Sequence, residues 1–291
     1  MAGGVREVWV AGDGNGAVEH PFAVLRRALA TSGAAATLDV CPAGVRRDAT
    51  WLPATALADP GTVRDLLDRM CTGQGIRHRP LGAVTFLSAV AYGTVTPAAF
   101  GLYLLDRVAD PSPDNLWFRT GGDAVRFDRP ALVRPVTALL DASAHPDAVM
   151  LPDRPTLTRW TGGRLVATLT PVVAAVRSVS RVGPRTLWSF VADSVHFTTL
   201  LAAMDAGHDL PAAWRRAADL VAAMAATAPG MWARPRPFPV RAADLDALWL
   251  VRGACCFLFR EGSGFCATCP LVPDPERHDR LAAWFRTRST G

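Results

Sequence analysis

The sequence predicts a mainly α (α+β) protein, in which a large helical domain carries a small N-terminal α/β portion and is followed by a C-terminal cysteine-rich segment. Three observations lead to this prediction. Strand-like and helix-like stretches alternate only before residue 41, helical periodicity dominates from Thr62 onward, and four of the six cysteines lie between residues 255 and 269. With 291 residues, 50% of them hydrophobic, the chain can bury a large core. We expect the helical domain to span residues 1–240 and the cysteine-rich segment residues 241–291.

The N-terminal portion consists of three short predicted elements. We expect a strand over Val5–Val10, a helix over Phe22–Ala30 and a second strand over Ala36–Val40.

A glycine-rich motif, Gly12–Ala17, lies between the first strand and the helix. It fits the G-x-G-x-x-A pattern of dinucleotide-binding turns, with Asp39 at a suitable distance for a ribose hydroxyl. Against that function, the carboxylate of Asp13 would face a pyrophosphate, Pro21 interrupts the start of the helix, and no second βαβ half follows. We therefore interpret the motif as an ordinary glycine-rich turn.

Helical stretches follow in order along the chain. Those that the periodicity predicts most clearly are Thr62–Met70, Leu187–Met204 and Ala212–Ala228. Residues 80–105 carry no charged side chain and exceed the roughly 20 residues that a membrane span needs. Because Pro97 lies inside this stretch, we expect two buried helices that break near Thr96–Pro97, and no transmembrane segment.

Prolines mark the predicted breaks between elements. They cluster at residues 111–113, 152–155 and 229–239, and the last of these is the expected linker into the cysteine-rich segment. A final helix is expected from Asp274 to about Arg286, with Asp274 as its N-cap and Pro275 at its first position.

The four C-terminal cysteines, Cys255, Cys256, Cys266 and Cys269, have the spacing C-C-x9-C-x2-C. Thiolates that converge on one centre are ligands for iron-sulfur clusters and for zinc, and a C-x2-C turn presents two of them from one loop. Adjacent residues of a strand point to opposite faces, so Cys255 and Cys256 can serve one centre only if the backbone turns there or if each holds a different metal atom. A two-iron cluster offers two metal atoms.

Two other uses of these cysteines stay open. Four thiolates also suit a structural zinc ion, although zinc ribbons usually use two C-x2-C pairs. Disulfides are disfavoured because the chain does not begin with a signal peptide and is not a small secreted scaffold. Cys41 and Cys71 lie far from this motif, and we expect them to be buried apolar side chains rather than ligands.

Two parts of this segment, Arg252–Arg260 and Gly264–Pro270, resemble the C-terminal signature of the siderophore-iron reductases, with a match in residue type at all four ligand positions. Asp114–Arg119 and Gly183–Ser194 are also similar to stretches of that family, so the resemblance covers about residues 80–291. The family often has ten residues between the cysteine pairs, and this chain has nine.

The resemblance implies a cytoplasmic oxidoreductase that binds a 2Fe-2S cluster through Cys255, Cys256, Cys266 and Cys269. Its substrate would be the Fe(III) of a hydroxamate siderophore, reduced by one electron and released as Fe(II), and its electron donor a ferredoxin or a ferredoxin reductase. Plant-type 2Fe-2S clusters have potentials of about −400 mV, which suits such a substrate. Two alternatives are a zinc-stapled module that binds a siderophore or a protein without redox chemistry, and a pure 2Fe-2S electron carrier.

Other functions have little support. The net charge is +5, but the arginines are scattered singly or in pairs, so we expect no nucleic-acid partner. The six histidines show no H-x-x-x-H spacing, and no G-x-S-x-G motif is present. Asp193 and His196 lie one turn apart and could border a substrate pocket or simply share a helix face. Further candidates are Trp117, Trp188 and Trp249 for lining a cavity, Phe257, Phe259 and Phe265 for tuning the centre, and Arg252 and Arg260 for receiving an acidic donor.

Overall fold

The computed structural model describes residues 20–31, 39–40, 51–119, 127, 130–228, 230–231, 235–242 and 245–289. The helices in these ranges are α1 (Pro21–Thr31), α2 (Pro60–Gln74), α3 (Arg79–Leu105), α4 (Arg154–Ser180), α5 (Pro184–Asp205), α6 (Leu210–Ala225) and α7 (Asp274–Ser289), with short 3-10 helices η1 (Ala54–Ala58) and η2 (Leu258–Glu261). The strands are β1 (Asp39–Val40), β2 (Trp51–Pro53), β3 (Arg107–Ala109), β4 (Leu116–Arg119), β5 (Pro130–Leu132), β6 (Thr137–Leu139), β7 (Ala148–Met150), β8 (Arg236–Ala242) and β9 (Leu245–Val251). The predicted mainly α fold is confirmed over this part of the chain.

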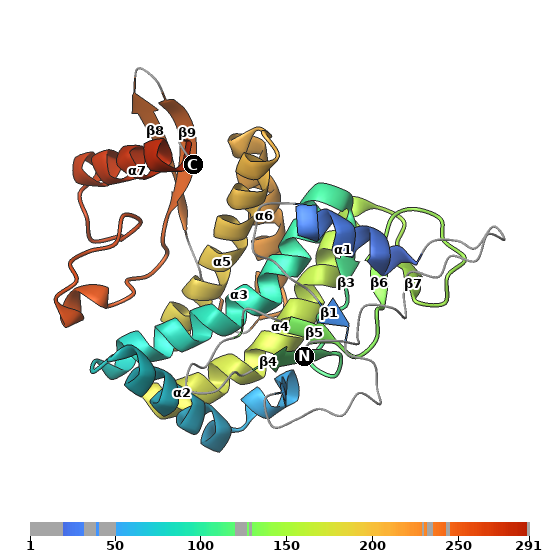
Figure 1. Ribbon diagram of the computed structural model, residues 1–291, viewed down its shortest axis with the longest axis horizontal. Helices are drawn as coiled ribbons and strands as arrows, with labels where there is room; N and C mark the ends of the chain where they lie inside the picture. The colour runs from blue at the N-terminus through green and yellow to red at the C-terminus, as the bar shows by residue number, and fades with distance from the viewer. Residues whose placement is uncertain are drawn as a thin grey trace, which may run out of the picture.

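The core lies between α2, α3, α4, α5 and α6, which pack against one another over most of their length (Figure 1). Helices α3 and α5 are at its centre, where Thr96 and Thr198 share a hydrogen bond of 3.3 Å between their hydroxyls. The predicted helices over residues 22–30, 62–70, 187–204 and 212–228 correspond to α1, α2, α5 and α6.

Helix α3 corrects the prediction that residues 80–105 break into two helices at Pro97. It runs unbroken from Arg79 to Leu105, with Pro97 inside it and fully buried. Proline removes one backbone donor from the helix, but packing against α4 and α5 on both sides outweighs the loss of that single bond.

Three helices of the core, α2, α4 and α6, begin with the same kind of N-terminal cap. Asp59, Asp153 and Asp209 accept a hydrogen bond from the backbone N–H three residues further on, at 2.7, 2.7 and 2.6 Å, and a proline follows in the first turn of each helix. The prolines at 152–155 therefore mark the start of α4 rather than a loop.

Residues 107–150 differ from the predicted helical periodicity, because they form short strands in two small sheets. The strand orders are β1-β5-β4-β2 and β3-β6-β7. Asn115 joins the segments: its side-chain amide donates to the carbonyls of Asp110 and Arg134 and accepts from the N–H of Arg134. Of the predicted N-terminal strands, Asp39–Val40 is present as β1, whereas Val5–Val10 and the glycine-rich motif lie outside the described residues.

A C-terminal unit of β8, β9 and α7 lies beside the helical core (Figure 1). The end of the expected proline-rich linker is a strand, β8, paired antiparallel with β9 from Arg236↔Val251 to Ala242↔Leu245. Pro237 and Pro239 are exposed and remove N–H donors along one edge of the strand only, and Phe238 and Val240, which alternate with them, are buried. Helix α7 begins at Asp274, one residue earlier than predicted, so Asp274 is its first residue rather than its N-cap, and its carboxylate pairs with Arg236 and Arg277.

Helices α3 and α5 are long and apolar enough to cross a membrane by length and composition. However, 78% and 83% of their most apolar windows are buried inside the protein, as in the central helices of a helical core.

Close packing between α3 and β3 gives a test of the fold. A methyl group on Gly101 would overlap the backbone carbonyl of Arg107, whereas one on Gly163 of α4 would meet open space. We predict that Gly101→Ala lowers the free energy of unfolding by about 1–3 kcal/mol. The control Gly163→Ala should be neutral or raise it by up to about 1 kcal/mol, because alanine is the better helix former. Urea denaturation of both variants measures this, and equal stabilities would contradict the packing of α3 on β3.

Candidate metal centre

The four predicted cysteines lie in one loop between β9 and α7, residues 252–273, which we call the cysteine loop. The loop reverses direction at three positions with left-handed backbone, Phe257 (φ 64°), Gly262 (φ 80°) and Gly264 (φ 71°). Phe257 directly follows the vicinal cysteines, so the chain turns where the two adjacent thiols would otherwise point apart. The glycines then return the chain, so that the second cysteine pair lies beside the first.

The sulfur atoms form two pairs. The thiol of Cys256 donates to the sulfur of Cys266 over 4.0 Å. Cys255 lies close enough to Cys269 to be among the causes that raise the pKa of its thiol. Among the described residues, only His20, His145 and Asp147 bring three ligand atoms within 4.8 Å of each other. The four sulfurs are therefore arranged as two pairs rather than as one tight cluster.

Each sulfur also interacts with the backbone N–H of the residue two positions further on. Phe257 donates to Cys255 at 3.4 Å, and Leu258, Thr268 and Leu271 donate to Cys256, Cys266 and Cys269 respectively. An N–H dipole directed at sulfur stabilises the thiolate over the thiol. Each of these N–H groups is a favourable contact for a sulfur that becomes anionic when it binds a metal.

The pKa values follow from these contacts. The hydrogen bond from Cys256 is the main cause that lowers the pKa of Cys266 to about 5, helped by the positive charge of Arg252 and by Thr268. The same bond, followed by burial, raises the pKa of Cys256. Burial also raises the pKa of Cys269, which is 2% exposed. The hydrogen bond thus favours a thiolate on Cys266 over one on Cys256.

Three charged residues hold the cysteine loop in place: Glu261 within the loop, Arg277 on α7 and Asp193 on α5. Glu261 accepts from the N–H groups of Arg77 and His78 just before α3, at 2.8 and 2.5 Å. Arg277 of α7, 1% exposed, donates to the carbonyl of Cys269 at 2.9 Å. The carboxylate of Asp193 on α5 accepts from the N–H of Gly253 at 2.9 Å.

The side chains of Asp193 and His196, which the sequence places one helical turn apart, have different surroundings in the structure. Asp193 faces the cysteine loop, and its Oδ2 atom is buried without a hydrogen-bond partner. Burial raises the pKa of this carboxyl to about 7, against the opposing effects of the Gly253 N–H and Arg252. His196 instead stacks on Trp214, with ring centroids 4.0 Å apart, and burial lowers its pKa to about 4.

The other residues that the sequence singled out, for lining a cavity or tuning the metal centre, lie in different parts of the structure. Phe259 and Phe265 lie against each other with centroids 5.2 Å apart, Phe257 contacts His78, and Arg260 covers Phe259. Trp188 and Trp249 are buried core residues, and Trp117 lies in β4. Cys71 is partly buried in α2, outside the cysteine loop, and Cys41 lies outside the described residues.

Two cavities are candidates for ligand binding. The larger, about 440 Å³, lies between the end of α3, the start of α4 and α6, near Tyr103 and Arg159. The smaller, about 170 Å³, includes Asp193, Arg252 and Thr268 and borders the cysteine loop. Since α3 rises 1.5 Å per residue, the larger cavity at Leu102 is about 20 Å from the smaller one at Ser88.

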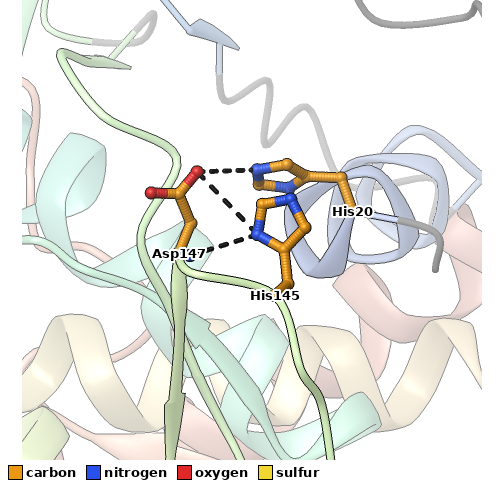
Figure 2. Close-up of side chains that lie close together, drawn as sticks. All are labelled: His20, His145 and Asp147. Atoms are coloured by element: carbon orange, nitrogen blue, oxygen red, sulfur yellow. Dashed lines mark hydrogen bonds and ion pairs between the residues drawn. The ribbon is translucent and has the colours of Figure 1, made fainter. Parts of the chain in front are cut away.

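A second cluster of ligand-type residues, which sequence analysis missed, joins the start of α1 to the segment before β7. His20, His145 and Asp147 converge there (Figure 2). The N–H of Phe22 donates to Nδ1 of His20, which leaves Nε2 to donate to Asp147 at 3.1 Å. The N–H of Asp147 likewise donates to Nδ1 of His145 at 3.1 Å.

This pattern of donors does not suit a metal. A neutral imidazole that binds a metal uses its one lone pair for the ion and keeps its proton on the other nitrogen. In both rings a backbone N–H already occupies that lone pair. We therefore interpret the three residues as a hydrogen-bonded clamp between α1 and the β6–β7 sheet.

Comparisons of the chain with protein-family models, with curated proteins and with solved structures find no match.

The clamp has a measurable contribution to stability. We predict that Asp147→Asn lowers the free energy of unfolding by about 0.5–1.5 kcal/mol, because the acceptor for His20 changes from a carboxylate to an amide. Asp65→Asn on the exposed face of α2 is the control, with a change within about 0.5 kcal/mol. Chemical denaturation with and without added Zn²⁺ is the measurement. A Zn²⁺-dependent stabilisation that Asp147→Asn removes would show a metal site instead.

Proposed function

We propose that Cys255, Cys256, Cys266 and Cys269 hold a 2Fe-2S cluster and that the protein is a cytoplasmic ferric-siderophore reductase. The observation that carries the proposal is the division of the four sulfurs into two pairs, each sulfur with its own backbone N–H donor. Free thiols of this kind persist in a reducing compartment, which agrees with the cytoplasm.

The pairing supports a centre with two metal atoms over a single zinc ion. Four thiolates around one Zn²⁺, each about 2.3 Å from the metal, lie about 3.8 Å from one another. Here one pair is separated by 4.0 Å, but no third sulfur joins it within 4.8 Å. Two pairs are the arrangement in which each of two iron atoms takes two thiolates, so the vicinal Cys255 and Cys256 would bind different irons.

The chemistry proposed for the protein is a one-electron reduction. A 2Fe-2S cluster supplies single electrons at low potential when bound. The protein contributes the N–H groups directed at sulfur and the charge of Arg252, which favour the anionic form of the ligands, and the paired rings of Phe259 and Phe265, which make the loop less polar. The substrate Fe(III) loses a unit of positive charge on reduction, its bonds to hydroxamate oxygens weaken, and Fe(II) is released.

The resemblance of residues 252–260 and 264–270 to siderophore-iron reductases supports the choice of substrate. A cavity that borders the cysteine loop agrees with it, because a substrate must approach the centre closely to accept an electron.

The electron donor is proposed to be an acidic ferredoxin or a ferredoxin reductase. Phe265 and Leu271, each next to or near a cysteine, are 41% and 57% exposed. Arg260 lies over the ring of Phe259, and Arg280, which also pairs with Glu276, donates to the carbonyl of Phe265, so arginine side chains lie beside the apolar surface of the loop. Apolar contact with complementary charge is typical of such transient electron-transfer partners.

Loss of one ligand tests the assignment of the cysteines. We predict that Cys256→Ser abolishes the red-brown colour and the visible absorption of the anaerobically purified protein, because one iron loses a thiolate. Cys71→Ser is the matched control and should keep the spectrum, since Cys71 lies outside the cysteine loop. A normal spectrum in Cys256→Ser would show that the vicinal pair does not bind the metal as proposed.

Reoxidation by substrate tests the activity. We predict that protein reduced with dithionite is reoxidised by ferric hydroxamate siderophores faster than a plant-type ferredoxin of equal concentration, with Fe(II) trapped by a chelator. Stopped-flow absorbance records both reactions. Rates equal to those of the ferredoxin would show that the protein is a pure electron carrier. A colourless protein that contains zinc would show that it is a binding module without redox chemistry.

A further inference from the structure

The smaller cavity has the features of a binding pocket built into the junction between the helical core and the cysteine loop. Its volume is about 170 Å³, and its walls come from α3, α5, β9 and the loop. Tyr92, Phe190 and Phe197 provide aromatic surface, and Asp193, Arg252 and Thr268 provide polar groups.

Two charged side chains in this pocket have unused hydrogen-bonding capacity. Oδ2 of Asp193 is buried without a partner, although the residue is only 5% exposed. Arg252 donates from Nε to Thr268 at 3.1 Å and lies over the ring of Phe190, and within the described residues it has no ion pair. A buried carboxyl oxygen without a partner costs free energy that a ligand donor would recover.

The pocket is connected to one of the two sulfur pairs. Thr268, which Arg252 contacts, has its hydroxyl 3.8 Å from the sulfur of Cys266. The backbone N–H of Arg252 also donates to the carbonyl of Thr268 at 3.0 Å. A ligand in the pocket would therefore lie beside the Cys256–Cys266 pair.

We propose that this pocket binds one amide-containing arm of a ferric hydroxamate chelate, with Arg252 facing its acceptor oxygens and Oδ2 of Asp193 facing an N–H or ammonium donor. This inference rests on the proposed function and adds the site of substrate recognition. The volume fits an arm rather than a whole trihydroxamate. The aromatic walls suit the methylene chains that connect such groups.

Burial supports this assignment for Asp193. Burial is the main cause that raises the pKa of this carboxyl, so a ligand donor that reaches Oδ2 would relieve part of the cost of keeping the group out of water. Its other oxygen stays engaged with Gly253, which fixes the orientation of the group.

Binding can be separated from reduction with a redox-inert probe. Gallium(III) desferrioxamine B has the charge and shape of the ferric complex, carries amide N–H groups and a terminal ammonium, and takes no electron. We predict that calorimetry detects its binding to the oxidised protein. Arg252→Gln and Asp193→Asn should each weaken that binding about tenfold or more, because each removes a charge-assisted hydrogen bond.

Three further variants complete the test. Ser88→Phe fills the pocket from α3 and changes no residue of the cysteine loop, so it should also abolish binding while the visible spectrum stays normal. If Arg252→Gln disturbs the metal centre, the binding measured for Ser88→Phe decides whether the pocket is the binding site. Arg215→Gln, on the exposed face of α6, controls for loss of charge and should bind normally. Arg159→Gln changes the larger cavity and should also bind normally.

The outcomes separate this inference from the proposed function. Wild-type protein that binds the gallium complex but reduces no ferric siderophore would support the inferred binding pocket and contradict the proposed reductase function. Protein that reduces ferric siderophores but binds the probe equally well in Arg252→Gln, Asp193→Asn and Ser88→Phe would overturn the pocket alone. No binding by the wild type, or binding lost only in Arg159→Gln, would overturn it as well.

Discussion

Adjacent side chains on an extended backbone point in opposite directions, and this constraint governs the geometry of the cysteine loop. Cys255 and Cys256 lie shortly after β9. Both can therefore face one metal atom only if the chain turns sharply there. The left-handed residue Phe257 supplies one turn, and Gly262 and Gly264 bring Cys266 and Cys269 back to meet them. The result is one partner for each vicinal thiol: Cys266 for Cys256, and Cys269 for Cys255. The pairing of sulfurs and the proposed two-iron centre both follow from this reversal.

The sequence contained most of the information about which residues form the centre and little about what supports them. The spacing of the four cysteines is local, so it could be recognised without a structure. Glu261, Asp193 and Arg277 are single charged residues whose partners belong to other elements: Glu261 contacts residues 184 and 183 positions away, and Asp193 a residue 60 positions away. No local pattern distinguishes them from surface charges. The same reason explains why the clamp of His20 and Asp147, 127 positions apart, was missed.

The fold was predictable where one element was long enough for periodicity to show. Helices α1, α2, α5, α6 and α7 were anticipated from apolar spacing and from helix-start signals. The short strands of residues 107–150 have three or four residues each, too few for alternation to be recognised, and their register depends on contacts such as those of Asn115. Pro97 misled the prediction because local propensity argues for a break, whereas burial between α4 and α5 keeps α3 continuous.

The central claim is that the paired sulfurs bind two irons bridged by inorganic sulfide. The most direct test is quantitative elemental analysis of protein purified without exposure to air, with iron, acid-labile sulfide and zinc measured on the same sample. The account predicts two irons and two sulfides per chain, and an electron paramagnetic resonance signal that appears on one-electron reduction. One zinc per chain with no sulfide would contradict it and would show that the cysteine loop is a structural zinc site.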